Sequence, residues 1–288
     1  MNRKHWLSLL LAAALLAAAM PAMAEPTGFN PHIPRFAQSR DEFLGDLSKY
    51  EIKMSVGKTS TLKVLAVPGF KTPKVTWVST NPRIAKVDSD GKVTGVSPGT
   101  CFIYAKTGGS YSTASCFVKI TGPGTAPKLL SVSDTKFYYN KTSFKPPFTL
   151  SALKKKIPGG YNVNDGYGYL GMIYGNKNYT KSHTNIWFSD CGAIFISFYA
   201  TTKSPISTYR GIKVGDSMGK VKQKYGEPTM REVSVLEGYP VRFFYYYMSF
   251  GPYSPFGESP GLWITFCFKT PANKIWYMRY DYNATYYY

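Results

Sequence analysis

Two glycine-flanked serine motifs are the clearest hints of enzyme chemistry in the chain. They are Gly215-Asp-Ser-Met-Gly219 and Gly257-Glu-Ser-Pro-Gly261, and both fit the pattern that presents a nucleophilic serine on a strand-to-helix turn. Hydrolases with this motif need a histidine that follows the serine in the chain, and the last histidine here is His183. We therefore predict that Ser217 caps a helix and is not a nucleophile.

Other patterns that could bind a cofactor or a metal lack the neighbours that they need. Gly166-Tyr-Gly-Tyr-Leu-Gly171 fits a dinucleotide-binding pattern, but it lies in a region rich in Tyr and Gly with no helix after it. His32 and His183 have no Cys or carboxylate at the spacing of zinc ligands.

Paired carboxylates could hydrolyse glycosides. The acids available for this chemistry in the C-terminal half are Asp165, Asp190, Asp216 and Glu258. In so basic a chain we interpret them as caps, turn residues or ion-pair partners. The sequence thus predicts a protein that is not an enzyme, with no catalytic residue, no cofactor site and no metal site.

The N-terminus indicates export. Arg3 and Lys4 precede an apolar run from Leu7 to Ala19, and Ala22-Met-Ala24 resembles a signal-peptidase site. The run is shorter than the roughly 20 residues of a membrane span. We predict a cleaved signal peptide over residues 1–24, no stable membrane span after cleavage, and an extracellular or cell-surface location. An uncleaved N-terminal anchor is the alternative. Residues 25–48 are expected to form a leader with one helical turn near 41–47.

The charge is strongly positive, with 35 Lys and Arg against 16 Asp and Glu. Without Arg3 and Lys4, 33 basic residues remain against the same 16 acidic ones, an excess of 17. Such a charge attracts polyanions. For an exported protein these are anionic cell-wall polymers, lipid headgroups or acidic glycans, and not nucleic acid. A basic surface that only maintains solubility is the alternative.

Aromatic residues crowd the C-terminal half, as in Phe243-Phe-Tyr-Tyr-Tyr247 and Trp276-Tyr-Met-Arg-Tyr280. Aromatic rings that alternate with Lys or Arg can stack on sugars or hold polyanions. They are also typical of strands that pack into a core, which is the interpretation we favour. The sequence assigns no ligand contact to a particular residue.

Short strands with alternating polarity run from Val75 to Pro82, Ile84 to Val96 and Pro98 to Ala105, broken by Asn-Pro, Asp-Gly and Pro-Gly. Over about residues 49–121 this stretch closely resembles the bacterial Ig-like domain, group 2. The resemblance implies an all-β sandwich that serves exported bacterial proteins as a binding or spacer module. It also explains Asp88 and Asp90 as a hairpin turn and not as Ca²⁺ ligands.

Four cysteines in an exported chain favour disulfides. If Gly108-Gly109 forms a two-residue turn, Cys101 and Cys116 lie directly opposite each other on the inward face of a hairpin. A disulfide or two buried thiols are both possible there, and we favour the disulfide. Cys191 and Cys267 would pair only by elimination.

A Pro- and Gly-rich linker, residues 122–127, leads into a second domain over residues 128–288. One helix is well specified there, by Asp216 or Ser217 as cap, Met218, Val221 and Tyr225 on one face, and Gly226 as the stop. A shorter helix is expected within 149–160. Strands are expected at 169–174, 185–188, 193–200, 241–248, 262–268 and 274–281.

The segment from Gly211 to Pro228 resembles the helix start of small α+β modules, similar to SmpA/OmlA lipoproteins and β-lactamase-inhibitor-protein repeats. The short helix within 149–160 and the strands after it have the same helix-then-sheet order, so we expect a half-repeat there and two tandem units, 128–206 and 207–288. The expected fold is therefore multidomain: an all-β Ig-like sandwich, then an α+β domain with an antiparallel sheet and helices on one face.

Two classes of function follow. The first is a non-enzymatic adhesion or binding protein that contacts cell-wall polyanions or glycans. The second is a module that recognises another exported protein, as an inhibitor or as an envelope assembly factor. Clustered, exposed aromatic residues on the sheet would favour the second class.

Overall fold

The structure is a computed structural model that describes residues 46–65, 72, 74–106, 113–122, 129–164, 169–175, 183–189, 195–201, 203–250 and 261–283. It consists mostly of strands in several sheets, with two α-helices among the described residues. The strand-rich character expected from the sequence is confirmed. No helix of the described segments is long and apolar enough to cross a bilayer. The predicted signal peptide, residues 1–24, lies outside the described residues.

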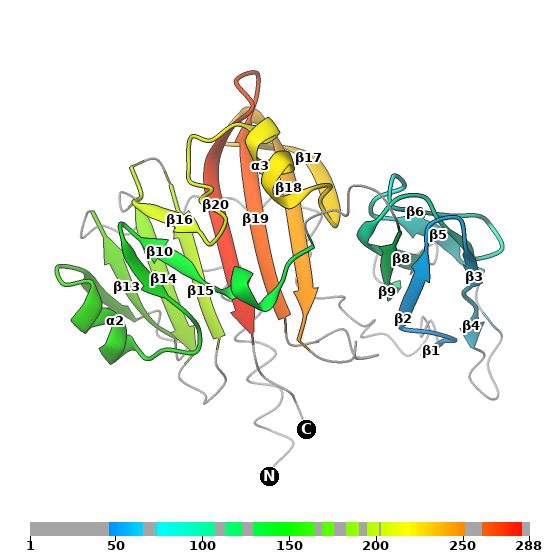
Figure 1. The fold of residues 1–288 in the computed structure, drawn as a ribbon, viewed down its shortest axis with the longest axis horizontal. Coiled ribbons are helices and arrows are strands. Elements are labelled where there is room, and N and C mark those ends of the chain that lie inside the picture. Colours follow the sequence, from blue (N-terminus) through cyan, green and yellow to red (C-terminus); the bar gives the residue numbers. More distant parts are fainter. Residues whose placement is uncertain are drawn as a thin grey trace, which may run out of the picture.

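Residues 46–122 form an N-terminal sandwich of short sheets (Figure 1). Its strands are β1 (Asp46–Leu47), β2 (Glu51–Ser55), β3 (Thr59–Thr61), β4 (Val64–Leu65), β5 (Thr76–Ser79), β6 (Ala85–Val87), β7 (Lys92–Gly95), β8 (Gly99–Lys106) and β9 (Thr113–Thr121). The order β2-β9-β8-β5 forms one sheet, β3-β7-β6 a second, and β1 pairs with β4. The pairing of β2 with β9 is parallel, and the others are antiparallel.

The core of the sandwich is made of apolar residues that alternate along the strands, as the sequence pattern predicts. Ile103, Val118 and Ile120 are fully buried in this cluster. Leu47 belongs to the same cluster at 2% exposure. The expected helical turn near 41–47 is therefore wrong at its described end, because Asp46 and Leu47 form strand β1. The apolar side chain of Leu47 gains more from burial in this core than it would from a free helical turn.

The C-terminal region, residues 129–283, is built on one eight-stranded antiparallel sheet with the order β12-β13-β14-β15-β20-β19-β18-β17. These strands are β12 (Tyr161–Asn164), β13 (Tyr169–Tyr174), β14 (Thr184–Ser189), β15 (Phe195–Ala200), β17 (Met230–Leu236), β18 (Tyr239–Ser249), β19 (Gly261–Lys269) and β20 (Lys274–Asn283). A smaller sheet, in the order β11-β10-β16, consists of β10 (Phe137–Tyr139), β11 (Thr142–Phe144) and β16 (Ile206–Thr208).

Helices α2 (Leu150–Lys156) and α3 (Met218–Tyr225) lie over one face of the large sheet, together with the smaller sheet (Figure 1). Leu153, Val221 and Tyr225 contribute buried side chains to a single cluster with residues of β18, β19 and β20. A 3₁₀ turn, η2 (Val132–Thr135), precedes the smaller sheet.

The strand order is symmetric about its centre. Helix α2 is followed by β12 to β15 and helix α3 by β17 to β20, and the last strand of each series meets the other at the β15–β20 pairing. The expected division into units 128–206 and 207–288, and the proposed domain boundaries, stay predictions.

Candidate functional site

Two of the residues that suggested hydrolase chemistry, Ser217 and Asp216, have structural roles. Ser217 is the N-cap of α3, and its side chain accepts a hydrogen bond from the Lys220 backbone N–H at 3.2 Å. Asp216 accepts from the Lys213 backbone N–H at 2.9 Å and forms an ion pair with Lys220 at 2.9 Å. The prediction of a helix cap at Ser217 is confirmed.

The other predicted positions do not form a site within the described residues. Asp88 closes the β6–β7 hairpin by accepting hydrogen bonds from the backbone N–H groups of Asp90 and Lys92, as expected. His183 has its Nδ1 2.8 Å from the Thr184 hydroxyl, and burial lowers the pKa of its imidazole. In the part of the chain that the structure describes, no group of three His, Cys, Asp or Glu could hold a metal ion. Several of the positions named from the sequence lie outside the described residues, among them His32, Asp165, Asp190, Glu258 and Ser259.

The cysteine register differs from the prediction. Cys101 pairs with Val118, and Cys116 pairs with Ile103, so the two cysteines are diagonal neighbours and not directly opposed. Both face the core, as predicted, and both are free thiols. Diagonal positions are about 7–8 Å apart, too far for a disulfide without backbone movement. Cys267 is also a buried free thiol, and Cys191 lies outside the described residues.

The aromatic run from Phe243 to Tyr247 is a core element. Each of these five side chains is at most 5% exposed. The preference for strand packing over an exposed ligand platform is confirmed for this run.

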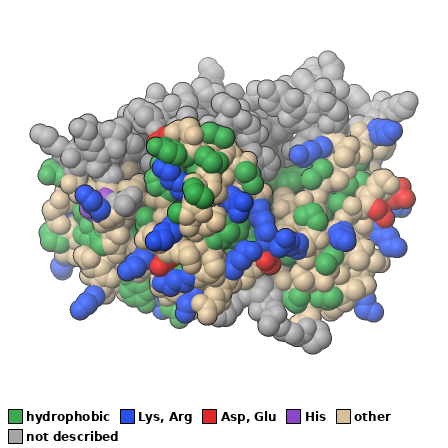
Figure 2. Space-filling view, turned by 90° about the horizontal axis from the view of Figure 1, so that it is seen from above, with side chains coloured by type: hydrophobic (Ala, Val, Ile, Leu, Met, Phe, Trp, Pro, Cys, Tyr) green, Lys and Arg blue, Asp and Glu red, His purple; other side chains and the backbone are tan. Residues whose placement is uncertain are grey.

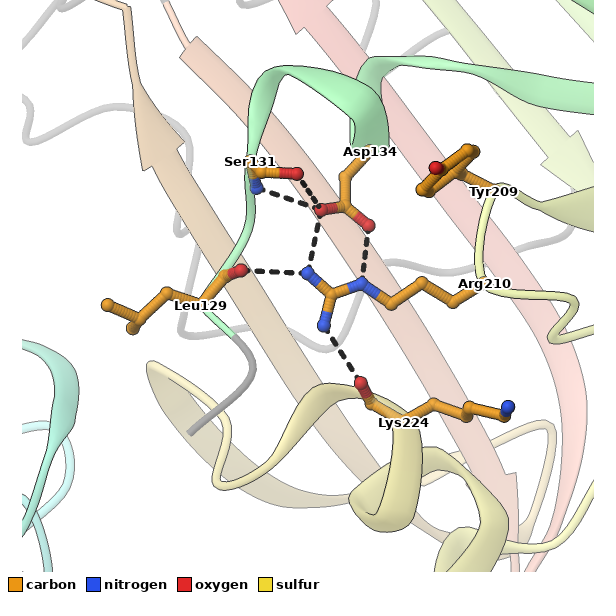
Figure 3. A pocket seen from close by; sticks show the side chains of 6 residues that line it. All are labelled: Leu129, Ser131, Asp134, Tyr209, Arg210 and Lys224. Carbon is orange, nitrogen blue, oxygen red and sulfur yellow. Dashed lines mark hydrogen bonds and ion pairs between the residues drawn. The ribbon is translucent and has the colours of Figure 1, made fainter. Parts of the chain in front are cut away.

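A shallow cavity of about 410 Å³ lies beside η2 and α3, lined by Leu129, Ser131, Asp134, Tyr209, Arg210 and Lys224 (Figure 3). At its base Arg210 forms a bidentate ion pair with Asp134, with Nε–Oδ1 at 2.6 Å and Nη2–Oδ2 at 2.7 Å. The Asp134 side chain is fully buried, and it also accepts hydrogen bonds from the backbone N–H and the hydroxyl of Ser131.

The remaining donors of Arg210 bind main-chain carbonyls. Nη1 donates to Lys224 O at 2.8 Å and Nη2 to Leu129 O at 2.7 Å (Figure 3). The Arg210 guanidinium also lies over the Tyr225 ring, 4.6 Å from its centroid. Because these partners use the carboxylate and most of the guanidinium donors, the pair fastens three segments together and offers little to a ligand.

A junction of hydrogen bonds and aromatic rings joins the N-terminal sandwich to the C-terminal region. Thr80 Oγ1 donates to Thr229 O at 2.9 Å, and Asn81 Nδ2 donates to Pro228 O at 2.7 Å. The hydroxyl oxygens of Thr100 and Thr229 are 2.8 Å apart in a buried position. These hydrogen bonds place the turn after β5 against the segment between α3 and β17.

Aromatic rings from both sides complete this junction. Phe102 and Phe117 of the sandwich pack on Tyr247 and Trp263 of the large sheet, with ring centroids 5.4–5.9 Å apart. Phe102, Phe117 and Tyr247 are at most 5% exposed. The sandwich is therefore docked on the sheet through a buried contact, and it does not stand apart from it as a stalk.

Three cationic residues belong to the elements that meet near this junction: Arg83 in the turn after β5, Lys222 on α3, and Arg231 on β17. We call these three the junction cations. Glu227 forms ion pairs with Arg231 and, at 3.7 Å, with Lys222. Lys222 Nζ and Arg231 Cζ lie over the Phe244 ring, 5.7 Å and 5.4 Å from its centroid. The view from above shows Lys and Arg side chains gathered between the two halves of the molecule, with few acidic ones (Figure 2).

The junction cations repel one another. Burial lowers the pKa of the Lys222 ammonium, and the charges of Arg231 and Arg83 lower it further. Burial likewise lowers the pKa of the Arg231 guanidinium, with a further contribution from Arg83. A region in which cations depress one another's pKa favours the binding of an anion.

Sequence reasoning missed both the Asp134–Arg210 pair and the junction cations, because their members are far apart in the chain. The period-two pattern from Met230 to Leu236 could have indicated strand β17, and with it an edge position for Arg231.

Comparison with known proteins concerns the N-terminal part of the chain. Residues 46–116 match the family model of the bacterial Ig-like domain (group 2). An uncharacterized protein of Clostridium acetobutylicum is 41% identical over 91 residues, which are 30% of this chain and 9% of that protein. The chain thus spans less than a tenth of the length of this relative. Residues 46–116 are a bacterial Ig-like domain of group 2.

Proposed function

We propose that this protein is a non-enzymatic binding protein of the bacterial cell surface that contacts anionic cell-wall polymers through Lys and Arg side chains. Ig-like domains of this group often occur in surface or adhesion-type proteins. The sequence adds an expected signal peptide and 35 Lys and Arg against 16 Asp and Glu.

The observation that carries the proposal is the composition of the junction, where three cations meet one carboxylate, Glu227. This excess arises inside a docked structure, from residues of both halves. It is therefore more than an evenly spread basic surface, which would serve solubility alone.

In this proposal the mature chain consists of the Ig-like domain and an α+β domain over 128–288, joined by the linker 122–127. The Ig-like domain contributes a rigid contact and one cation, and the α+β domain contributes the other two. Acidic glycans are a second ligand class with the same requirement for cations.

Recognition of another exported protein is the alternative class. It requires clustered, exposed aromatic side chains on the large sheet. The five consecutive aromatic residues of β18 are buried, and Tyr247 is covered by Phe102 and Phe117. The rings of this run are therefore not available as anchors for a partner protein.

The test is retention of the full mature chain on purified bacterial cell wall, at low salt and in about 0.5 M salt, where the Debye length is about 4 Å. We expect retention at low salt and release at high salt. Absence of retention at low salt would refute the proposal, and salt-independent retention would assign binding to apolar contacts.

A further inference from the structure

We propose that the junction cations form a binding site for a single phosphate group of an anionic polymer, shared between the Ig-like domain and the C-terminal region. This inference rests on the proposed function for its ligand class, and it adds the place of binding and the need for both halves of the molecule.

Each cation is held by a different element. The turn that carries Arg83 is fixed by Asn81, whose side chain donates to Pro228 O and accepts from the Arg83 backbone N–H at 3.2 Å. The Arg83 carbonyl accepts a hydrogen bond from the Ser97 hydroxyl at 2.6 Å. The backbone of Arg83 is therefore positioned before any ligand arrives, and its exposed side chain can move toward one.

Lys222 and Arg231 are positioned by the Phe244 ring, over which both cationic groups lie. Their side chains are 37% and 28% exposed, so both are partly withdrawn from water yet still accessible. Such partial burial strengthens the attraction for an anion compared with a fully exposed lysine.

The donors at this site exceed the acceptors. Glu227 is the acidic partner of Lys222 and Arg231, and no acceptor for the Arg83 guanidinium is found among the described residues. Arg231 Nε is buried without a hydrogen-bond partner in the described part of the chain. An excess of two positive charges remains after Glu227 is counted.

A phosphate group matches these donors better than a single carboxylate. Guanidinium groups bind phosphate oxygens in a bidentate manner, and an ammonium acts as an additional point charge. A phosphodiester of a polymer carries two charged non-bridging oxygens and two bridging oxygens, so it offers the two guanidinium groups and the ammonium more acceptor atoms than a carboxylate does.

Other cations of the protein differ from these three. Arg210 is bound to Asp134 and to two carbonyls, and Lys220 is paired with Asp216 at 2.9 Å. The junction is therefore the place where cations from both halves gather in excess of their acidic partners.

The test uses the full mature chain and inorganic phosphate as the probe, with affinity measured by the rise in melting temperature against chloride at equal ionic strength. Arg83→Gln and Arg231→Gln should each weaken phosphate binding about tenfold, the loss expected for one charge-assisted hydrogen-bonded contact. Lys92→Gln on β7 and Lys274→Gln on β20 remove the same charge elsewhere and should change affinity less than about twofold.

Glu227→Gln provides a gain-of-function arm. It removes the carboxylate that competes for Lys222 and Arg231, so phosphate should bind several-fold more tightly, while Glu51→Gln, a matched exposed acid, should have little effect. Without phosphate, Arg83→Gln should melt no lower than wild type, because it relieves repulsion.

The outcomes separate this inference from the proposed function. Wall retention with equal losses in all four cation variants would keep the proposed function and overturn the junction site. Phosphate binding that depends on Arg83 and Arg231, without retention on the wall, would support the junction site and refute the proposal that the ligand is a cell-wall polymer. No phosphate binding by the wild type, or no gain from Glu227→Gln, would overturn the inference.

Discussion

The hydroxyl oxygens of Thr100 and Thr229 lie 2.8 Å apart in the buried contact between the Ig-like domain and the C-terminal region. Thr229 Oγ1 also accepts the backbone N–H of Tyr247 at 3.1 Å. One small side chain thus links strand β8, the segment before β17, and strand β18. The two halves of the molecule are joined by a buried, hydrogen-bonded interface as well as by the chain between them.

Replacing Thr100 with valine keeps the shape of the side chain but removes one of the two hydrogen-bond partners of the Thr229 hydroxyl, and the backbone N–H of Tyr247 remains as the other. We expect Thr100→Val to lower the free energy of unfolding by about 1 kcal/mol, the net contribution of one buried hydrogen bond. Urea unfolding measures it. Thr76→Val, at an exposed position of β5, should change stability by less than about 0.5 kcal/mol. Equal effects of the two variants would show that the hydroxyl pair contributes nothing.

The Asp134–Arg210 pair should be a major contributor to the stability of the C-terminal region. Asp134→Asn leaves the Arg210 charge largely buried, and we expect a loss of about 3 kcal/mol in urea unfolding. The comparison variant is Glu51→Gln, which breaks the more exposed pair with Lys53 and should cost less than about 1 kcal/mol. A loss below 1 kcal/mol for Asp134→Asn would contradict the assigned role.

Glu232 predicts a pH dependence of stability with an unusual sign. Burial raises the pKa of its carboxyl above the usual 4.5, although the hydrogen bond from the Tyr245 hydroxyl at 2.8 Å opposes this shift. The folded chain therefore holds the proton at pH values where the unfolded chain has already released it. Hence this group's contribution to stability falls as pH rises from about 4.5 through the raised folded-state pKa.

Glu232→Gln should remove this pH dependence. At pH values above the raised folded-state pKa it should stabilise the protein, because the amide oxygen of glutamine still accepts the hydrogen bond from the Tyr245 hydroxyl. Unfolding free energies measured between pH 4 and pH 8 test this, about the range in which a raised carboxyl pKa acts. Glu237→Gln, in the exposed turn between β17 and β18, is the control that should retain the wild-type slope. A steeper slope in Glu232→Gln would contradict the assignment.

The cysteines should be unreactive in the folded protein. Burial raises the pKa of Cys101 and of Cys267 to about 12 in each case, so little thiolate forms at neutral pH. We expect no alkylation of Cys101, Cys116 or Cys267 in the native state. In denaturant without a reductant, mass spectrometry should find all three alkylated. A peptide in which Cys101 and Cys116 are linked would contradict the structure and restore the sequence-based disulfide.

Local signals in the sequence predicted local structure well. Helix α3 begins after Ser217 and ends before Gly226, as expected. Gly226 has a positive φ of 74°, which suits glycine. These boundaries could be predicted because a cap acts within a few residues of the chain. The strands from β18 to β20 followed from their apolar runs in the same way. These features depend on neighbours in the chain.

Register and docking could not be predicted in this way. The β8–β9 hairpin pairs residues whose numbers sum to 219, as in Ile103 with Cys116, whereas the expected two-residue turn at Gly108-Gly109 would require 217. A shift of two residues keeps every side chain on its face but changes its partner, so the alternation of the sequence cannot detect it. The turn that carries Arg83 lies against the segment before β17 in a docked interface that includes Phe102, Phe117 and Tyr247, and this contact has no local signature in the sequence.

The shared phosphate site is tested most directly by a double-mutant cycle on Arg83 and Arg231. Binding to purified anionic wall polymer is measured at about 50 mM salt, where the Debye length is about 14 Å. If both guanidinium groups hold one phosphate, either single change to glutamine removes most of the affinity, and the double variant loses much less than the product of the two losses. Losses that multiply, and that match those of Lys92→Gln and Lys274→Gln, would contradict a shared site.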